Sequence, residues 1–164
     1  GKSYGKQSKN NSSLKSRYRL MWMDAVYEPG EVKVVAYNKD GKAVAEKTVR
    51  TAGKPHHIEL VSNRNELTAD GKDLAYVTVK VVDKDGNLCP TDSRLIHFSV
   101  KGAGKFRAVA NGDPTNLEQF HLPKMHAFHG MLTAIVQAGE IAGDLVLTAK
   151  ASGVKTGTVH LQAK

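Results

Sequence analysis

The sequence predicts an all-β protein built from tandem immunoglobulin-like β-sandwich domains, the first of which is incomplete. Two observations predict this fold. Apolar residues recur at every second position in many short segments, which is the period of a strand with one buried face. Clusters of Gly, Pro, Asn, Asp and Ser separate these segments. No segment shows a sustained helical period. Many short strands separated by turns, without helices, are typical of a β-sandwich.

The first predicted domain, residues 1–53, holds only the last strands of a sandwich. Strands are expected over residues 17–23, 32–36 and 43–49, and Asp40-Gly41 between the last two is a strong hairpin signal. An immunoglobulin-like domain has about seven strands, so this one is truncated. Half a sandwich would expose an apolar sheet face. We therefore expect residues 1–53 to dock on the second domain or on a neighbouring copy of the chain, giving a homodimer.

The second predicted domain, residues 54–164, has the usual size of an immunoglobulin-like sandwich. The boundary is placed where Gly53 and Pro55 interrupt the strand pattern. Strands are expected over residues 57–61, 74–82, 95–100, 105–110, 132–137, 145–151 and 156–162. Two inner sheet faces are expected, one from Ile96, Phe98 and Val100 and another from Leu145, Leu147 and Ala149.

Composition excludes several classes of partner. The 164 residues are 40% hydrophobic and 24% charged, which is a globular composition. No apolar run approaches the roughly 20 residues needed to span a bilayer, so we expect no membrane partner. The net charge of +8 is spread along the chain, so we interpret it as a solvated surface and expect no nucleic-acid partner. Cys89 is the only cysteine and is interpreted as a structural thiol.

Specific runs of residues carry a family resemblance. Tyr-Glu-Pro-Gly-Glu at residues 27–31 and Arg-Thr-Ala-Gly at residues 50–53 resemble the end of the immunoglobulin-like module that follows the catalytic barrel in family 2 glycoside hydrolases of gut bacteria. Asn-Gly-Asp-Pro-Thr at residues 111–115, then Glu118 and Ala-Phe-His-Gly at residues 127–130, are similar to the terminal domain of the same enzymes. Residues 67–74 and 79–86 resemble bacterial immunoglobulin-like repeats, including those of invasin and intimin.

The resemblance implies the C-terminal accessory region of a bacterial, Bacteroides-like, family 2 glycoside hydrolase of the β-galactosidase type. It implies that the two catalytic carboxylates belong to a barrel outside this chain, so no catalytic, metal-binding or cofactor-binding residue is expected here. The implied partners are the catalytic and other domains of the same polypeptide, with carbohydrate as a further candidate. The implied location is periplasmic or secreted.

The richest polar cluster in the sequence allows three interpretations. Its members are Asp113, Glu118, His121, His126 and His129. A metal or acid–base site would need them to converge, but their spacing is not that of paired ligands. A structural turn set by Gly112 and Pro114, with Phe120 and Phe128 buried, is favoured. A third interpretation makes this region an interface or a sugar-proximal loop, for which the candidate residues are Asn111, Asp113, Thr115, Glu118, Phe128, His129 and, in the first domain, Trp22.

Two other functions remain open from the sequence. A carbohydrate-binding module could use Trp22 to stack on a sugar ring, and an adhesion domain of the invasin or intimin type would share the fold. The segment 83–87 begins like a calcium loop but lacks the later acidic ligands, so a hairpin turn is favoured. His56 and His57 are interpreted as polar residues of the surface or of the domain junction, and not as metal ligands.

Overall fold

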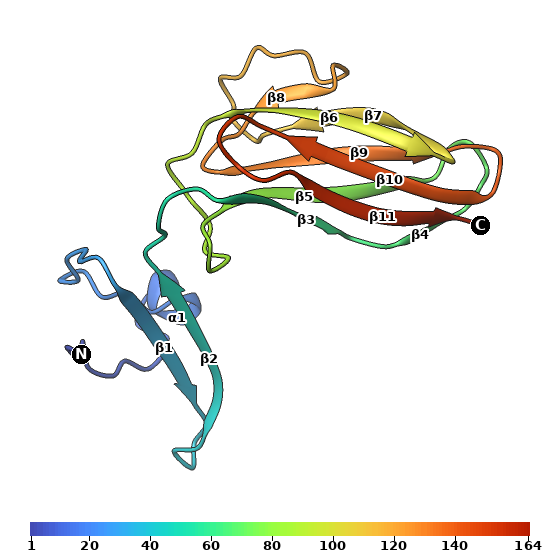
Figure 1. Cartoon of the computed structure of the whole chain (residues 1–164). Coiled ribbons are helices and arrows are strands. Elements are labelled where there is room, and N and C mark those ends of the chain that lie inside the picture. The colour runs from blue at the N-terminus through green and yellow to red at the C-terminus, as the bar shows by residue number, and fades with distance from the viewer. The chain divides into compact units, whose positions relative to one another are not determined.

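The computed structural model describes residues 1–164, which divide into two compact units, Gly1–Arg50 and Thr51–Lys164. Figure 1 colours them from blue at the N-terminus to red at the C-terminus. The chain is almost entirely strand and loop, as the predicted all-β class requires. The assignment of residues 1–53 to a truncated immunoglobulin-like domain stays a prediction.

The first unit contains one β-hairpin, as predicted. Strand β1 (Glu31–Tyr37) pairs antiparallel with β2 (Ala43–Arg50), and Val32 lies opposite Val49. In the connecting turn, the Asn38 side-chain oxygen accepts hydrogen bonds from the backbone N–H of Asp40 (3.1 Å) and Lys42 (2.9 Å). Side-chain acceptance of backbone groups is the usual reason that Asn starts a turn.

The strand expected over residues 17–23 is wrong. Residues Leu14–Tyr18 form a short helix, α1, whose N-terminus is capped by Ser13: its hydroxyl accepts from the Ser16 N–H at 3.1 Å. A serine at the N-cap followed by a polar residue at N3 nucleates a helical turn, and this local signal outweighs the weak apolar alternation. Beyond the helix, the Met21 backbone bonds the side chain of Gln7 rather than a neighbouring strand.

The second unit is a sandwich of two sheets (Figure 1). One sheet has four strands in the order β3-β5-β9-β7, and the other has five in the order β4-β11-β10-β6-β8. The strands are β3 (His57–Ser62), β4 (Glu66–Leu67), β5 (Leu74–Val82), β6 (Leu95–Gly102), β7 (Gly104–Ala110), β8 (Lys124–His126), β9 (Met131–Ala138), β10 (Gly143–Lys150) and β11 (Gly157–Ala163).

All seven strands predicted for the second domain are present, but two aspects differ from expectation. The short strands β4 and β8 were missed because two or three residues are too few to display a period of two. The apolar rows of β6 and β10 were expected on separate faces, whereas they lie side by side in one sheet, with Leu147 opposite Val100. Periodicity indicates that a row is buried but not which sheet contains it.

The core lies between the two sheets. From β5 it receives Val77, Val79 and Val81, each fully buried, and from β10 it receives Leu145 and Leu147, also fully buried. The chain passes from one sheet to the other at Gly102, where φ is +91° and an added Cβ would lie 2.0 Å from the Asp144 carbonyl oxygen. Only glycine fits this crossing, because the backbone of β10 approaches it so closely.

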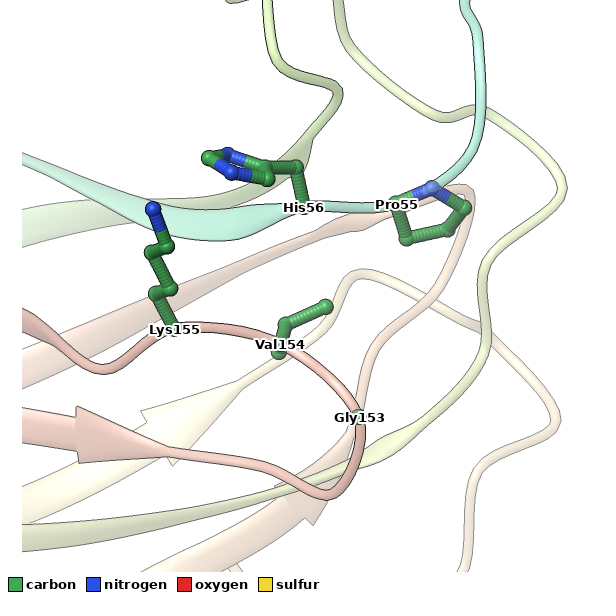
Figure 2. Close-up of a pocket in the computed structure, with 5 residues that line it drawn as sticks. All are labelled: Pro55, His56, Gly153, Val154 and Lys155. Atoms are coloured by element: carbon green, nitrogen blue, oxygen red, sulfur yellow. The ribbon is translucent and has the colours of Figure 1, made fainter.

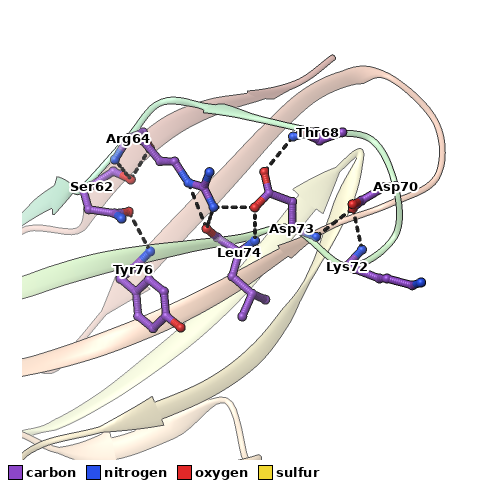
Figure 3. Close-up of polar contacts among 9 residues, drawn as sticks. Ser62, Arg64, Thr68, Asp70, Lys72, Asp73, Leu74 and Tyr76 are labelled. Carbon is purple, nitrogen blue, oxygen red and sulfur yellow. Dashed lines mark hydrogen bonds and ion pairs between the residues drawn. The ribbon is translucent and has the colours of Figure 1, made fainter.

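The motif at residues 67–74 is a loop ordered by its own carboxylates (Figure 3). Asp70 accepts the backbone N–H groups of Lys72 and Asp73, both at 2.8 Å. Asp73 accepts the Thr68 N–H at 2.8 Å and forms an ion pair with Arg64. These acidic residues therefore hold the backbone of the loop at this end of the sandwich.

Candidate functional site

The predicted polar cluster lies in the long connection between β7 and β8 and in the turn after β8. The connection begins at Asn111 and ends at Pro123. Its side chains come from segments without regular structure, so their positions depend on hydrogen bonds inside the loop.

The first part of the loop is a pair of side-chain-directed turns. Asn111 accepts the Asp113 N–H at 3.1 Å, and Asp113 accepts both the N–H (2.8 Å) and the hydroxyl (2.7 Å) of Thr115. The backbone and side-chain hydrogen bonds from Thr115 lower the pKa of the Asp113 carboxyl below its usual range. Asp113 is therefore an ionised turn residue, and one of its two carboxylate oxygens, Oδ1, is engaged by Thr115.

The second part of the loop is fastened to β8. The Glu118 carboxylate accepts the His126 backbone N–H at 3.1 Å, and its other oxygen lies 3.1 Å from Nδ1 of the same histidine. The Asn111 side-chain amide donates to the His126 carbonyl oxygen at 3.0 Å. Asn111 and Glu118 thus both form hydrogen bonds with His126 of β8, from two separate points along the loop. Their side chains are positioned to hold this loop against the sheet.

Phe128 and His129 form the turn after β8. Their ring centroids are 4.2 Å apart, and Nδ1 of His129 lies 3.2 Å from the Pro90 carbonyl oxygen. His129 has a φ of +50°, and Gly130 after it passes so close to Cys89 that an added Cβ would lie 2.3 Å from the Cys89 carbonyl oxygen. This turn therefore packs against the segment before β6.

The structure brings only some of the candidate residues together. Glu118 meets His126, and Asp113 is near enough to His129 for the histidine to lower its pKa further. His121 is exposed. The chain contains no group of three or more His, Cys, Asp or Glu side chains that could hold a metal ion. Trp22 belongs to the other unit, where it is half-buried and its indole N–H donates to the Tyr4 carbonyl oxygen at 2.8 Å.

The sequence-based interpretation missed three apolar side chains displayed by this loop. Leu117 is 96% exposed, Phe120 is 56% exposed and Leu122 is 36% exposed. The expectation that Phe120 is buried is therefore wrong: its carbonyl bonds the Val109 N–H at 2.8 Å, which fixes the backbone while the ring stays outside. Apolar residues inside an otherwise polar loop were the available signal.

A depression lies where the chain enters the sandwich (Figure 2). It is lined by Pro55, His56, Gly153, Val154 and Lys155. Nδ1 of His56 lies 3.0 Å from Nδ1 of His57, so the N–H of one ring donates a hydrogen bond to the bare ring nitrogen of the other. The backbone of His56 pairs with that of Lys155 (2.9 Å), which makes this depression an exposed seam between two segments.

The turn at residues 83–87 is a hairpin turn, as favoured from the sequence, with Val82 bridged antiparallel to Leu88. Asp83 is almost completely buried and accepts the N–H groups of Gly53 (2.7 Å) and Asn87 (2.8 Å). These hydrogen bonds, with the one from the Gly53 N–H the strongest, hold the pKa of Asp83 far below its usual range. The neighbouring Cys89 is buried, and burial raises the pKa of its thiol, which disfavours the reactive thiolate.

The one helix, α1, has 5 residues, and nothing helical in the structure reaches the length and apolarity of a membrane span.

Two protein families match the chain. Residues 58–160 match the family described as Glycoside hydrolase family 2 C-terminal domain 5, and residues 1–45 match a domain of unknown function (DUF4982). The first match covers nearly all of the sandwich. It includes both sheets and the connection between β7 and β8, residues 111–123, which we call the Asn111 loop. The second covers the α1 segment and most of the hairpin.

Individual proteins are similar over much or all of the chain. β-Galactosidase BoGH2A of Bacteroides ovatus is 42% identical over 164 residues, which are 100% of this chain and 19% of that protein. A β-galactosidase of Thermoanaerobacter pseudethanolicus is 34% identical over 68% of this chain and 13% of its own length. A solved glycosyl hydrolase family 2 member from Bacteroides cellulosilyticus has a TM-score of 0.78 and 31% identity, covering 85% of this chain and 18% of that one. The chain thus spans about a fifth or less of the length of these relatives.

Proposed function

Because this chain belongs to the glycoside hydrolase family 2 C-terminal domain 5 family, we propose that it serves as the non-catalytic accessory region of a family 2 glycoside hydrolase of the β-galactosidase type. Its role is to pack on the catalytic and other domains of one polypeptide and to support them during carbohydrate degradation. The chemistry resides elsewhere in that polypeptide, and this region contributes buried surface and rigidity.

The observation that supports this proposal most directly is the use of the polar side chains in the Asn111 loop. Asn111, Asp113 and Glu118 each accept or donate hydrogen bonds that fix the loop's own backbone or that of β8. Acid–base catalysis needs a carboxyl group directed at a substrate position and free to exchange a proton. A carboxylate such as Asp113, whose pKa is lowered by Thr115, is instead suited to holding a turn.

The likeness to longer enzymes supports the same role. This chain aligns in full with BoGH2A while covering 19% of it. Supporting modules in multidomain enzymes act by interdomain burial, which requires a stable sandwich rather than a catalytic pair. The well-buried core of residues 51–164 satisfies that requirement.

The first unit supports the proposal through the sidedness of its hairpin. One face contains the ion pairs Glu31–Arg50 and Lys33–Glu46, each at 2.8 Å. The opposite face contains Val32, Val34 and Val49, which are 67%, 49% and 63% exposed. A two-stranded hairpin is at best marginally stable alone. We propose that residues 1–53 are the last strands of an immunoglobulin-like domain whose other sheet covers the valine face.

A hydrolysis assay tests the proposed function. Residues 1–164 and the longest polypeptide encoded by the gene are each incubated with 4-nitrophenyl β-D-galactoside. We expect turnover by the long polypeptide and none by residues 1–164. Turnover by residues 1–164 that disappears in the Glu118→Gln variant would overturn the proposal, because a contaminant would not respond to that change. A long polypeptide inactive on a panel of β-glycosides would overturn it as well.

The rival function, a carbohydrate-binding module, is tested by calorimetry on residues 1–164 with β-linked oligosaccharides. The accessory role predicts no saturable heat. Saturable binding that is lost in the Trp22→Ala variant would replace the accessory role by sugar binding.

A further inference from the structure

The loop between β7 and β8 displays an apolar patch, which we define as Leu117, Phe120 and Leu122. These three side chains lie within six consecutive residues and are 96%, 56% and 36% exposed. The turn formed by the Leu122 N–H and the Gln119 carbonyl oxygen, 3.3 Å apart, keeps Phe120 and Leu122 close along the chain. Single exposed apolar residues are ordinary on a protein surface, but a group in one loop marks a contact surface.

The patch is held on a fixed backbone. The residues between and beside its members bond the rest of the domain: the Asn116 oxygen accepts the Glu118 N–H at 3.0 Å, and Glu118 binds His126. The Phe120 carbonyl accepts the Val109 N–H at 2.8 Å, and the Pro123 carbonyl accepts the Phe98 N–H at 2.8 Å. A loop already ordered in this way loses little conformational entropy when a partner covers its apolar side chains.

The chemistry of the patch favours a protein partner over a sugar. Sugar recognition requires hydrogen-bond donors and acceptors that face the ring hydroxyls. Around the patch, Asn116 and Glu118 direct their polar atoms into the loop and toward β8. Three apolar side chains face outward from residues 117–122, with the exposed polar side chains of Gln119 and His121 between them. The apolar majority matches an apolar protein surface.

The size of the patch favours a partner within the same polypeptide. A stable interface between separate molecules buries about 800 Å² on each partner. One large apolar side chain contributes on the order of 150–250 Å² at most. Three such side chains therefore bury less area than an interface between separate molecules needs. A tethered partner needs less, because the tether supplies an effective concentration in the millimolar range. About four-fifths of BoGH2A lies outside the region that aligns with this chain. The BoGH2A polypeptide is therefore long enough to include such a partner domain.

We propose that Leu117, Phe120 and Leu122 form the surface by which the sandwich docks into an apolar depression on another domain of the same polypeptide. The polar residues Asn111, Asp113 and Glu118 act as positioning residues that hold this surface in shape. This inference rests on the proposed accessory function and adds the contact surface and the chemistry of its partner.

Amide hydrogen exchange tests the inference on the long polypeptide and on residues 1–164. Peptides covering residues 115–123 should exchange at least tenfold more slowly in the long polypeptide. The Leu117→Ser/Phe120→Ser double variant should lose this protection. The matched control is Ile141→Ser, which replaces an apolar side chain of the same domain that is 79% exposed and lies outside the loop. It should leave the protection of residues 115–123 unchanged.

The contrary outcomes are distinct. Equal exchange of residues 115–123 in both proteins overturns the docking surface. In isolated residues 1–164, exchange at residues 115–123 that slows as the protein concentration rises would assign the patch to a second copy of the chain. Exchange that slows when an oligosaccharide is added would assign the patch to sugar binding. Either result overturns the inference. Activity of the long polypeptide on β-galactosides is read in parallel. An active polypeptide with an unprotected loop removes the docking surface and keeps the proposed function, whereas an inactive one removes the proposed function.

Discussion

In the sandwich of residues 51–164, the alternate side chains of the central strands are fully buried, as Val79 and Leu147 are, whereas in the hairpin of residues 1–50 the alternate side chains are exposed, as Val32 is at 67%. Both regions have the same period of two, and both form regular antiparallel ladders. The difference is a second sheet. Alternation in the sequence specifies a strand, and only a facing sheet turns the apolar half of that strand into a core.

The two regions also share a turn, which makes the comparison more exact. Asn-Lys-Asp-Gly at residues 38–41 and Asp-Lys-Asp-Gly at residues 83–86 differ only in their first residue. Asn38 accepts the N–H groups of residues 40 and 42, and Asp83 accepts those of residues 85 and 87. Asp83 alone is buried, and it also accepts the Gly53 N–H. The same turn, with a side-chain acceptor at its first residue, is therefore exposed to solvent in one unit and buried at that residue in the other.

The sandwich and the hairpin should differ most in their response to the loss of a large apolar side chain. Leu147→Ala should lower the free energy of unfolding of the sandwich by about 2–5 kcal/mol, because it leaves a cavity between the sheets. Val34→Ala, in the exposed face of the hairpin, should change it by less than about 0.5 kcal/mol. Urea unfolding followed by circular dichroism measures both. An equal loss in the two variants would mean that the hairpin face is covered in residues 1–164, and the contrast between the regions would be lost.

An intermediate effect is expected at glycines with positive φ. Gly102 has φ +91° and faces the Asp144 carbonyl oxygen, whereas Gly41 has φ +77° and open space around its Cβ position. Both Ala substitutions incur the left-handed strain of roughly 1–2 kcal/mol, and Gly102→Ala should destabilise further because its Cβ would meet the Asp144 carbonyl oxygen. The effect of Gly102→Ala is measured as the shift in the thermal unfolding midpoint. The effect of Gly41→Ala is measured as the change in the exchange rate of the Lys42 amide.

The control for this comparison is Gly86→Ala in the sandwich, since Gly86 has φ +82° and nothing within 4 Å of its Cβ position. It should lower the unfolding midpoint less than Gly102→Ala does. If the two variants unfold together, the crossing between the sheets is not the tight point that its geometry indicates.

Sequence reasoning predicted most of the fold and little of the site, and the reason is physical. Strand β5 was predicted with its observed limits, because nine residues with regular alternation leave little ambiguity. Strand β8 was missed, because its three residues depend on pairing with Leu95–His97. Helix α1 was missed because a Ser13–Ser16 cap is a short-range signal.

The role of the Asn111 loop could be predicted only in part. The turn formed by Asp113 and Thr115 follows from local residue types, and it was expected. The contact of Glu118 with His126 joins a loop to a strand, and the exposure of Phe120 depends on what surrounds the ring. Neither depends on periodicity, so neither was accessible without the fold.

Acid should distinguish the two turns, because the side chain of Asp83 titrates and that of Asn38 does not. Hydrogen bonds from Gly53 and Asn87 lower the folded-state pKa of Asp83 below the unfolded value of about 3.9. A lowered folded pKa means that Asp83 contributes stability above the unfolded pKa and loses it as the pH falls through that value toward the folded pKa. The wild type and Asp83→Asn should therefore differ in unfolding midpoint by a constant amount from pH 7 to pH 5. Below about pH 4 the difference should shrink.

Asn38→Ala is the matched control for Asp83→Asn, because Asn38 caps the equivalent turn without a titratable group. Its effect on amide exchange of the hairpin should show no pH dependence beyond that of intrinsic exchange. Thermal scans at half-unit steps between pH 7 and pH 3 supply the measurement for Asp83. A wild-type advantage that persists undiminished to pH 3 would leave Asp83 without a pH-linked role, and the two turns would then differ in burial alone.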